Sequence, residues 1–269
     1  MNIVDIVSST ENYNLHSHTQ FCDGRDSMEE IALAARNAGM EYWAFTPHSP
    51  VPVESSCNMR MSRMDEYLAE CSRLKSLHSD VMHVFASQEI DYLGDFWGPH
   101  VDYFQKLPID FRLGSVHFVP NQDGVLIDCD GRFERFSGYL KDGFGNDLRY
   151  VVEKYFEQVL NMLERGGLDL LGHFDKIAGN ASMSDPDIEN QEWYESLVDD
   201  VINHAVSSGV VIEINTKAFA DKSRFYPAER WWGKLFDAGA VLAVDSDAHY
   251  AGKVVSGRME AYDRLRKFS

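Results

Sequence analysis

The stretch ENYNLHSHTQFCDG, residues 11–24, joins a short apolar run to two histidines that are spaced one residue apart. If this run is extended, His16 and His18 lie on the same face, because side chains alternate with a period of two along a strand. Asp23 follows five residues later in the same stretch. Two neighbouring imidazoles at a strand end suit a metal ion better than a hydrophobic core, so we expect further ligands elsewhere in the chain.

The composition is that of a globular protein with a sizeable core, because 44% of the 269 residues are hydrophobic. No apolar run approaches the roughly 20 residues that cross a membrane, and the N-terminal stretch lacks the features of a signal peptide. The four cysteines, Cys22, Cys57, Cys71 and Cys129, form no CxxC pair. Their pattern predicts free thiols in a reducing cytoplasm.

The formal net charge is −18 at neutral pH, and no basic stripe offsets it. Such a surface repels nucleic acids and anionic membranes, so we expect neither as a partner. An anionic substrate would need a site in which the local charge is reversed, and bound metal ions could provide that reversal.

Short apolar runs alternate with amphipathic stretches along the whole chain. Seven runs are predicted to be buried strands, at residues 13–18, 42–48, 82–90, 111–118, 168–175, 210–215 and 240–249. Six helices are predicted between and after them, at residues 27–39, 62–79, 149–167, 191–209, 227–239 and 256–268. The first of these helices opens with a capping box formed by Ser27 and Glu30.

This alternation favours parallel strands joined by right-handed crossovers. Seven strands with helices outside them predict an α/β protein with a closed (β/α)7 barrel, and a doubly wound open sheet is the alternative. Residues 119–148 interrupt the rhythm and are rich in Gly, Asp and Phe. We interpret them as an insertion over the barrel mouth within a single domain of residues 1–269.

Nine potential ligands lie at the carboxyl ends of six predicted strands. They are His16, His18, Asp23, His48, Glu89, His117, His173, Asp247 and His249. A parallel barrel brings these strand ends together on one face, where barrel enzymes keep their active sites. Imidazole and carboxylate ligands without thiolates suit zinc, iron or manganese, and nine of them can hold three ions if one carboxylate bridges. Four other histidines, His78, His83, His100 and His204, are assigned to the surface or to packing.

In chain order, HSHTQFCD, PHS, QEIDY, GSVHF, GHFD and DSDAH resemble the metal motifs of the PHP (polymerase and histidinol phosphatase) superfamily. Together with the chain length, GSVHF, GHFDKI, EINT and the later YP look most like the histidinol-phosphate phosphatase branch. The resemblance implies a distorted (β/α)7 barrel, a trinuclear centre of Zn, Mn or Fe, a cytoplasmic location and a role in histidine biosynthesis. Pro47 precedes His48 where the superfamily often has Asp, so one carboxylate beside that imidazole is missing.

The resemblance also implies how the nine side chains divide among three ions. The first set is His16, His18, Glu89 and Asp247; the second is Glu89, as the bridge, with His117 and His173; the third is Asp23, His48 and His249.

The implied reaction is hydrolysis of L-histidinol phosphate to L-histidinol and phosphate by a metal-bridging hydroxide, because coordination lowers the pKa of water from 15.7 toward about 7. Asp175, His249 or a metal-bound water could protonate the departing alkoxide. Arg224 and Lys217 follow the sixth predicted strand and could bind the phosphate, while Glu213 could contact a cationic substrate. The oligomeric state is not predicted.

Three alternatives share parts of this pattern. The site could cleave another phosphoester, such as phosphotyrosine or a small nucleotide. The domain could instead be a metal-stabilised binding module without turnover, with closed coordination shells. An amidohydrolase-like barrel shares the opening His-x-His, but it usually recruits a modified lysine, and no lysine is predicted to end a strand.

Overall fold

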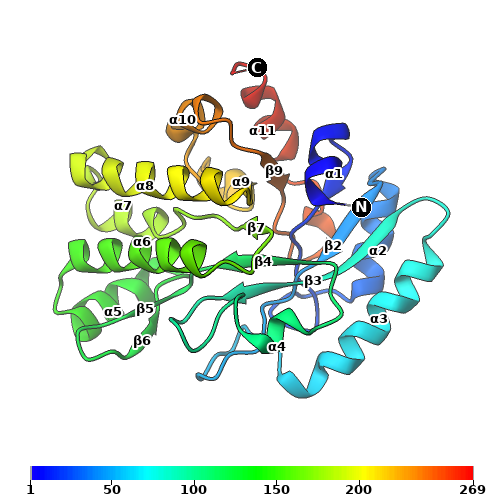
Figure 1. Cartoon of the computed structure of the whole chain (residues 1–269), viewed down its shortest axis with the longest axis horizontal. Helices are drawn as coiled ribbons and strands as arrows, with labels where there is room; N and C mark the ends of the chain where they lie inside the picture. The colour runs from blue at the N-terminus through cyan, green and yellow to red at the C-terminus, as the bar shows by residue number, and fades with distance from the viewer. Residues whose placement is uncertain (1, 269) are drawn as a thin grey trace.

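Seven parallel strands form the central sheet of the computed structural model, which describes residues 2–268 (Figure 1). The strands are β1 (Tyr13–Asn14), β2 (Tyr42–Phe45), β3 (His83–Asp91), β4 (Phe111–Ser115), β7 (Leu170–Leu171), β8 (Val211–Asn215) and β9 (Leu242–Asp245). Each overlaps one of the predicted apolar runs. Their order in the sheet follows the chain, and every neighbouring pair is parallel.

Side chains close the sheet between its first and last strands, β1 and β9. The backbone N–H of Leu15 donates to Asp245 Oδ1 at 2.5 Å, and that of Ser246 donates to Asn14 Oδ1 at 2.7 Å. An isolated parallel bridge lies further along the same seam. The sheet is therefore a distorted, nearly closed (β/α)7 barrel, as predicted. The alternative of a doubly wound open sheet is wrong, because that fold would place the first strand inside the sheet and not at its edge.

Six helices correspond to the predicted ones and cover the outside of the barrel. They are α2 (Met28–Asn37), α3 (Met64–Leu77), α6 (Leu148–Arg165), α8 (Glu192–Ser208), α10 (Trp232–Asp237) and α11 (Arg258–Leu265). Figure 1 shows α6 and α8 side by side on one flank and α2 and α3 on the opposite flank. The predicted capping box is present, because the Ser27 hydroxyl and the Glu30 carboxylate each accept the other residue's backbone N–H.

Several elements were not predicted. They are the helices α1 (Ile3–Ser9), α4 (Asp102–Gln105), α5 (Phe133–Phe144), α7 (Ala178–Ser184) and α9 (Phe219–Lys222), the strands β5 (Phe118–Pro120) and β6 (Leu126–Asp128), and the 3₁₀ turns η1 (Met61–Arg63), η2 (Ile188–Asn190), η3 (Glu229–Trp231) and η4 (Ala251–Lys253). In α1, Ile3 and Ile6 join the buried cluster inside the barrel, together with Tyr13 and Leu15. This helix therefore supplies apolar side chains to the barrel interior.

Residues 119–148 contain most of an antiparallel hairpin, β5–β6, followed by α5, and these elements lie beside α6 in Figure 1. Phe136 and Phe144 are buried in the same cluster as Val152 and Phe156 of α6. These aromatic side chains hold the segment on α6. The turn after β6 reaches the barrel mouth, where Asp128 and Asp130 line a cleft.

Within residues 2–268, no helix combines the length and the apolar character that crossing a bilayer requires. All four cysteines are free thiols, as predicted.

The seam between β1 and β9 predicts a large effect for Asn14→Ala. The buried Asn14 amide accepts from the backbone and the hydroxyl of Ser246 and donates to the carbonyl of His16 at 2.6 Å. Its removal leaves buried polar groups unpaired, so we expect a loss of about 2–4 kcal/mol in the free energy of unfolding.

Urea denaturation of the purified protein measures this loss, and Ser27→Ala is the control. That substitution removes only a helix cap on the surface and should cost about 1 kcal/mol. An Asn14→Ala protein as stable as the control would show that the seam does not hold the barrel closed.

Candidate metal centre

All nine predicted ligands lie at the carboxyl end of the barrel. His16, His18 and Asp23 follow β1, His48 follows β2, Glu89 lies in β3, His117 follows β4, His173 follows β7, and Asp247 and His249 follow β9. Seven of the nine are buried, while Asp23 and His249 are more accessible. The other four histidines, His78, His83, His100 and His204, belong to none of the candidate metal groups found among the described residues. The structure therefore separates the histidines at strand ends, which cluster, from the other four, as the sequence predicts.

The first predicted set forms a compact shell of donor atoms. The Nε2 atoms of His16 and His18 are 3.0 Å apart, and each is 3.3 Å from Oε2 of Glu89. Oδ1 of Asp247 is 3.2 Å from His18 Nε2 and 3.7 Å from His16 Nε2. Ligand bonds of about 2.0–2.1 Å give a tetrahedron with edges of about 3.3–3.4 Å, so these four atoms match the shell of one zinc-sized ion.

The second oxygen of Glu89 faces a different pair of imidazoles. Oε1 is 2.8 Å from His173 Nε2 and 3.4 Å from His117 Nε2. His48 also approaches this carboxylate, with Nδ1 at 3.0 Å from Oε2. Because its two oxygens face two groups of donors, Glu89 has the geometry of a bridging ligand.

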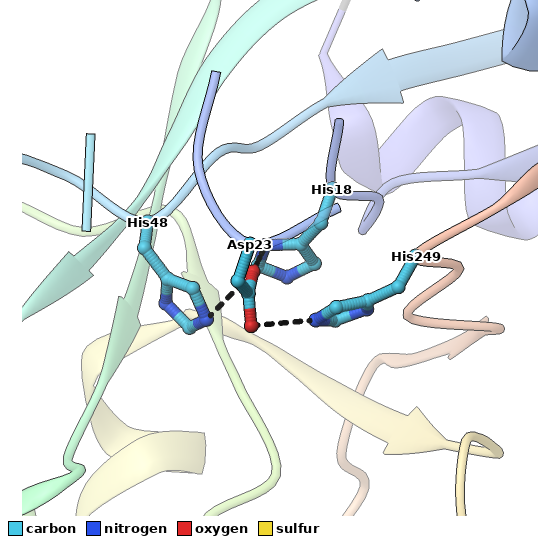
Figure 2. A group of neighbouring side chains, drawn as sticks. All are labelled: His18, Asp23, His48 and His249. Atoms are coloured by element: carbon cyan, nitrogen blue, oxygen red, sulfur yellow. Dashed lines mark ion pairs between the residues drawn. The ribbon is translucent and has the colours of Figure 1, made fainter. Parts of the chain in front are cut away.

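The third set surrounds Asp23 at the entrance (Figure 2). Asp23 Oδ2 is 3.3 Å from His249 Nε2, and Oδ1 is 3.8 Å from His48 Nε2. His18 joins this group through Nδ1, which is 3.7 Å from Asp23 Oδ1. His18 and His48 thus each present one ring nitrogen to Asp23 and the other to Glu89, so the groups overlap more than the predicted division implies.

The hydrogen bonding of this cluster fits bound cations. Within residues 2–268, Glu89 Oε2 and His117 Nε2 are buried and have no hydrogen-bond partner. Both lie close to other nitrogen and oxygen atoms that could bind the same metal ion. A buried polar atom without a partner is costly, and a divalent ion among these lone pairs removes that cost. The donor set of imidazoles and carboxylates is the one that zinc, iron and manganese accept.

The electrostatics point the same way. Burial raises the pKa of Glu89, but His48, His16 and His117 outweigh it and hold that pKa well below its usual range. Burial lowers the pKa of His18 and His173, which favours their neutral form, whereas neighbouring carboxylates outweigh burial and raise the pKa of His16, His48 and His117. The carboxylates are therefore ionised, which is the form that binds metals, and they attract positive charge to the cluster.

The backbone has a positive φ at two of the candidate ligands, His173 and Asp247. Asp247 has a φ of +46°, in the left-handed region that residues other than glycine rarely adopt. Such strain persists where the surrounding structure enforces it and is concentrated at functional sites. The turn after β9 thereby places Asp247 and His249 against His18: the Asp247 carboxylate lies 3.2 Å from His18 Nε2, and the His249 ring stacks on the His18 ring.

Two carboxylates support the imidazoles from behind. Glu213 of β8 is fully buried and accepts from His16 Nδ1 at 2.6 Å and from the backbone N–H of His173 at 2.8 Å. Asp91 accepts from His117 Nδ1 at 2.6 Å. A metal-binding histidine usually donates its second N–H to such a carboxylate, which fixes the tautomer and the ring orientation. Glu213, which was predicted to contact a cationic substrate, instead lies behind the candidate ligands and does not line the cleft. Asp91 was not predicted, although the motif QEIDY contains it.

Two other predicted site residues lie away from the cleft. Asp175 is fully buried and accepts from the backbone of Ala228 at 2.8 Å, and burial raises its pKa to about 7. Arg224 makes a two-pronged ion pair with Glu189 at 2.8 and 2.9 Å. Neither Asp175 nor Arg224 lines the cleft in the described part of the chain. Their predicted roles as proton donor and phosphate ligand are therefore not supported.

A cleft of about 590 Å³ opens above the cluster and is large enough for a small metabolite. Five of the candidate ligands line it: Asp23, His48, His117, Asp247 and His249. Lys217 lines it as predicted, with Nζ at 3.0 Å from His249 Nε2. Lys176 also lines the cleft, although no lysine was predicted to end a strand. It reaches the cleft because β7 ends at Leu171 and Lys176 belongs to the loop that follows.

Sequence comparison finds relatives that share nearly the full length of this chain. A protein of Schizosaccharomyces pombe named "Probable histidinol-phosphatase" is 28% identical over 251 residues, which cover 87% of this chain and 79% of the relative. The histidinol-phosphatase of Bacillus subtilis is 24% identical over 273 residues, covering 89% of this chain and 94% of the relative.

Solved structures share the fold. The hisK protein of Listeria monocytogenes superimposes with a TM-score of 0.81 at 18% identity, over 92% of this chain and 99% of that one. Histidinol phosphate phosphatase of Lactococcus lactis, solved in complex with zinc, L-histidinol and phosphate, gives a TM-score of 0.75 at 20% identity, over 96% of this chain and 94% of that one.

The family model described as the PHP domain matches residues 14–217, a segment that includes seven of the nine candidate ligands. Because this match covers most of the chain, the protein belongs to the PHP domain family.

Proposed function

We propose that this chain is a metal-dependent histidinol-phosphatase, a phosphoric monoester hydrolase that converts L-histidinol phosphate to L-histidinol and phosphate. The observation that carries the proposal is the position of Glu89, whose two oxygens face two groups of imidazoles below a cleft of metabolite size. The curated relatives bear the corresponding name, and the Lactococcus lactis protein with the same fold was solved with histidinol and phosphate.

The donor set supports three divalent ions, of zinc, manganese or iron. Glu89 would bridge the first two, and Asp23 would anchor the third at the entrance with His48 and His249. Ions bound there would activate a water molecule as the nucleophile at neutral pH and neutralise charge on the phosphoryl oxygens.

The protein's own side chains set the geometry for this reaction. Glu213 and Asp91 fix the tautomers of His16 and His117, so that Nε2 of each ring faces the cluster. Lys217 Nζ lies in the cleft at 3.4 Å from Asp247 Oδ1, where it could meet an oxygen of the substrate. His249 is assigned as a ligand, so its predicted second role as a proton donor would require it to leave the ion.

A substrate panel tests the assigned activity. The protein, loaded with manganese or zinc, is assayed on histidinol phosphate, phosphotyrosine and a nucleoside monophosphate. We expect kcat/KM for histidinol phosphate to exceed the others by at least about 100-fold, because buried polar groups that match one substrate reject others. Chelation should abolish the activity and added metal should restore it. Similar rates on all esters would refute the assignment, and tightly held metal without hydrolysis would favour a binding module.

The substitution Glu213→Gln tests how the ligands are oriented. It keeps the side-chain size but places an NH₂ group against either the His16 ring or the His173 backbone, both of which donate to Glu213. We expect a loss of about 10–100-fold in metal affinity, measured by competition with a coloured chelator. Glu189→Gln is the matched control, because Glu189 pairs with Arg224 outside the cleft. Equal affinities in the two variants would show that Glu213 does not hold the ligands.

A further inference from the structure

A largely buried ion pair, Lys176–Asp130, lies in the cleft beside the metal-binding side chains. Lys176 Nζ is 3.0 Å from Asp130 Oδ2, and their side chains are 13% and 36% exposed. The lysine follows β7, whereas the aspartate belongs to the turn between β6 and α5. The pair therefore joins the barrel to the segment that was predicted to be an insertion.

Lys176 lies close to the candidate ligands. Lys176, Asp130 and His117 line the main cleft together, and the same three residues line a small adjoining cavity. The ammonium group is therefore placed beside His117, one of the imidazoles that face Glu89.

Burying an ammonium group is costly unless it is paired, and Asp130 provides that partner at 3.0 Å. A lysine has three N–H donors, and Asp130 can occupy one of them. Two other cations of the cleft are placed differently: Arg135 pairs with Asp128 at 3.0 Å, and Lys217, whose side chain is 40% exposed, contacts His249 and Asp247. Lys176 therefore has donors to spare at the position where an anion on the metal centre would lie.

We propose that Lys176 binds the phosphoryl group of the substrate against the metal centre and that Asp130 positions the lysine. The inference rests on the proposed phosphatase function and assigns a phosphate-binding residue to it. It also gives the turn between β6 and α5 a role in the site, since that turn supplies the carboxylate that fixes the lysine.

The experiment measures binding of inorganic phosphate to the metal-loaded protein by calorimetry. Lys176→Met should weaken phosphate binding by at least about tenfold, since it removes a charge-assisted hydrogen bond. Metal content and thermal stability are measured alongside. Lys222→Met is the matched control, because Lys222 is exposed at the same cleft and the charge change is identical. Lys176→Gln replaces Lys176→Met if that variant does not fold.

Asp130→Asn separates this role from a purely structural one. Asparagine keeps a side-chain oxygen that can accept from Lys176, so the lysine stays in position while the negative charge that repels phosphate is removed. If Lys176 binds phosphate, Asp130→Asn should therefore not weaken phosphate binding, whereas Lys176→Met should. If the pair only fastens the segment, both variants should weaken phosphate binding alike, and the proposal is wrong. It is also wrong if Lys176→Met binds phosphate as tightly as Lys222→Met.

The readout does not depend on the substrate. A protein that hydrolyses no histidinol phosphate, but whose binding of inorganic phosphate depends on Lys176, would contradict the proposed function and support this inference. If the Lys176→Met variant hydrolyses histidinol phosphate as well as the unmodified protein, the proposed function is supported and this inference is contradicted.

Discussion

The carboxylate of Glu89 is the group on which the rest of the site depends. It is buried at the centre of the barrel mouth, and five imidazoles approach its two oxygens. A buried negative charge is tolerated only when positive charge or hydrogen bonds surround it. The imidazoles come from loops after four different strands. They can surround the Glu89 carboxylate only if the carboxyl ends of those strands lie at the same height along the barrel axis.

This requirement explains why closure of the barrel matters for the site. The first strand carries His16 and His18 into the cluster, while the last strand carries Asp247, and His18 Nε2 lies 3.2 Å from the Asp247 carboxylate. The first ligand group is therefore complete only if β1 and β9 are adjacent. Among the described residues, no regular ladder of backbone hydrogen bonds joins β1 to β9, and side chains such as Asn14 and Asp245 link the two strands instead. The contacts that close the barrel therefore also bring the first group of candidate ligands together.

Much of this arrangement could be predicted from the sequence because a parallel barrel converts strand order into position. Once seven apolar runs were placed, every potential ligand at a strand end was assigned to one face, and the nine side chains do converge there. The face of a strand and the depth along it are harder to predict. Glu213 lies within β8, below the mouth, so it meets the backs of the ligands and not the cleft.

Loops set the limit of such prediction. Arg224 was expected at the mouth because it follows the sixth strand of the barrel, but the loop returns it to Glu189. Lys176 was not among the predicted site residues: the sequence predicts a strand over 168–175, whereas β7 ends at Leu171 and residues 174–177 form a turn that places Lys176 at the cleft. Helix α5 was missed because the glycines of residues 119–148 resemble a loop, although its apolar side chains pack on α6. In each case the decisive contacts are long-range, and no local pattern encodes them.

The acidic surface does not conflict with an anionic substrate once distances are considered. At physiological salt, surface charges are screened over about 8–10 Å, so most of the net charge of −18 acts weakly inside the cleft. Three divalent ions would bring six positive charges to a cluster whose ligands include three carboxylates, Asp23, Glu89 and Asp247. The local charge is then positive, in a buried site where electrostatic interactions are strong. A small phosphate ester can enter such a site, whereas a polymeric nucleic acid would have to lie along the acidic surface outside it.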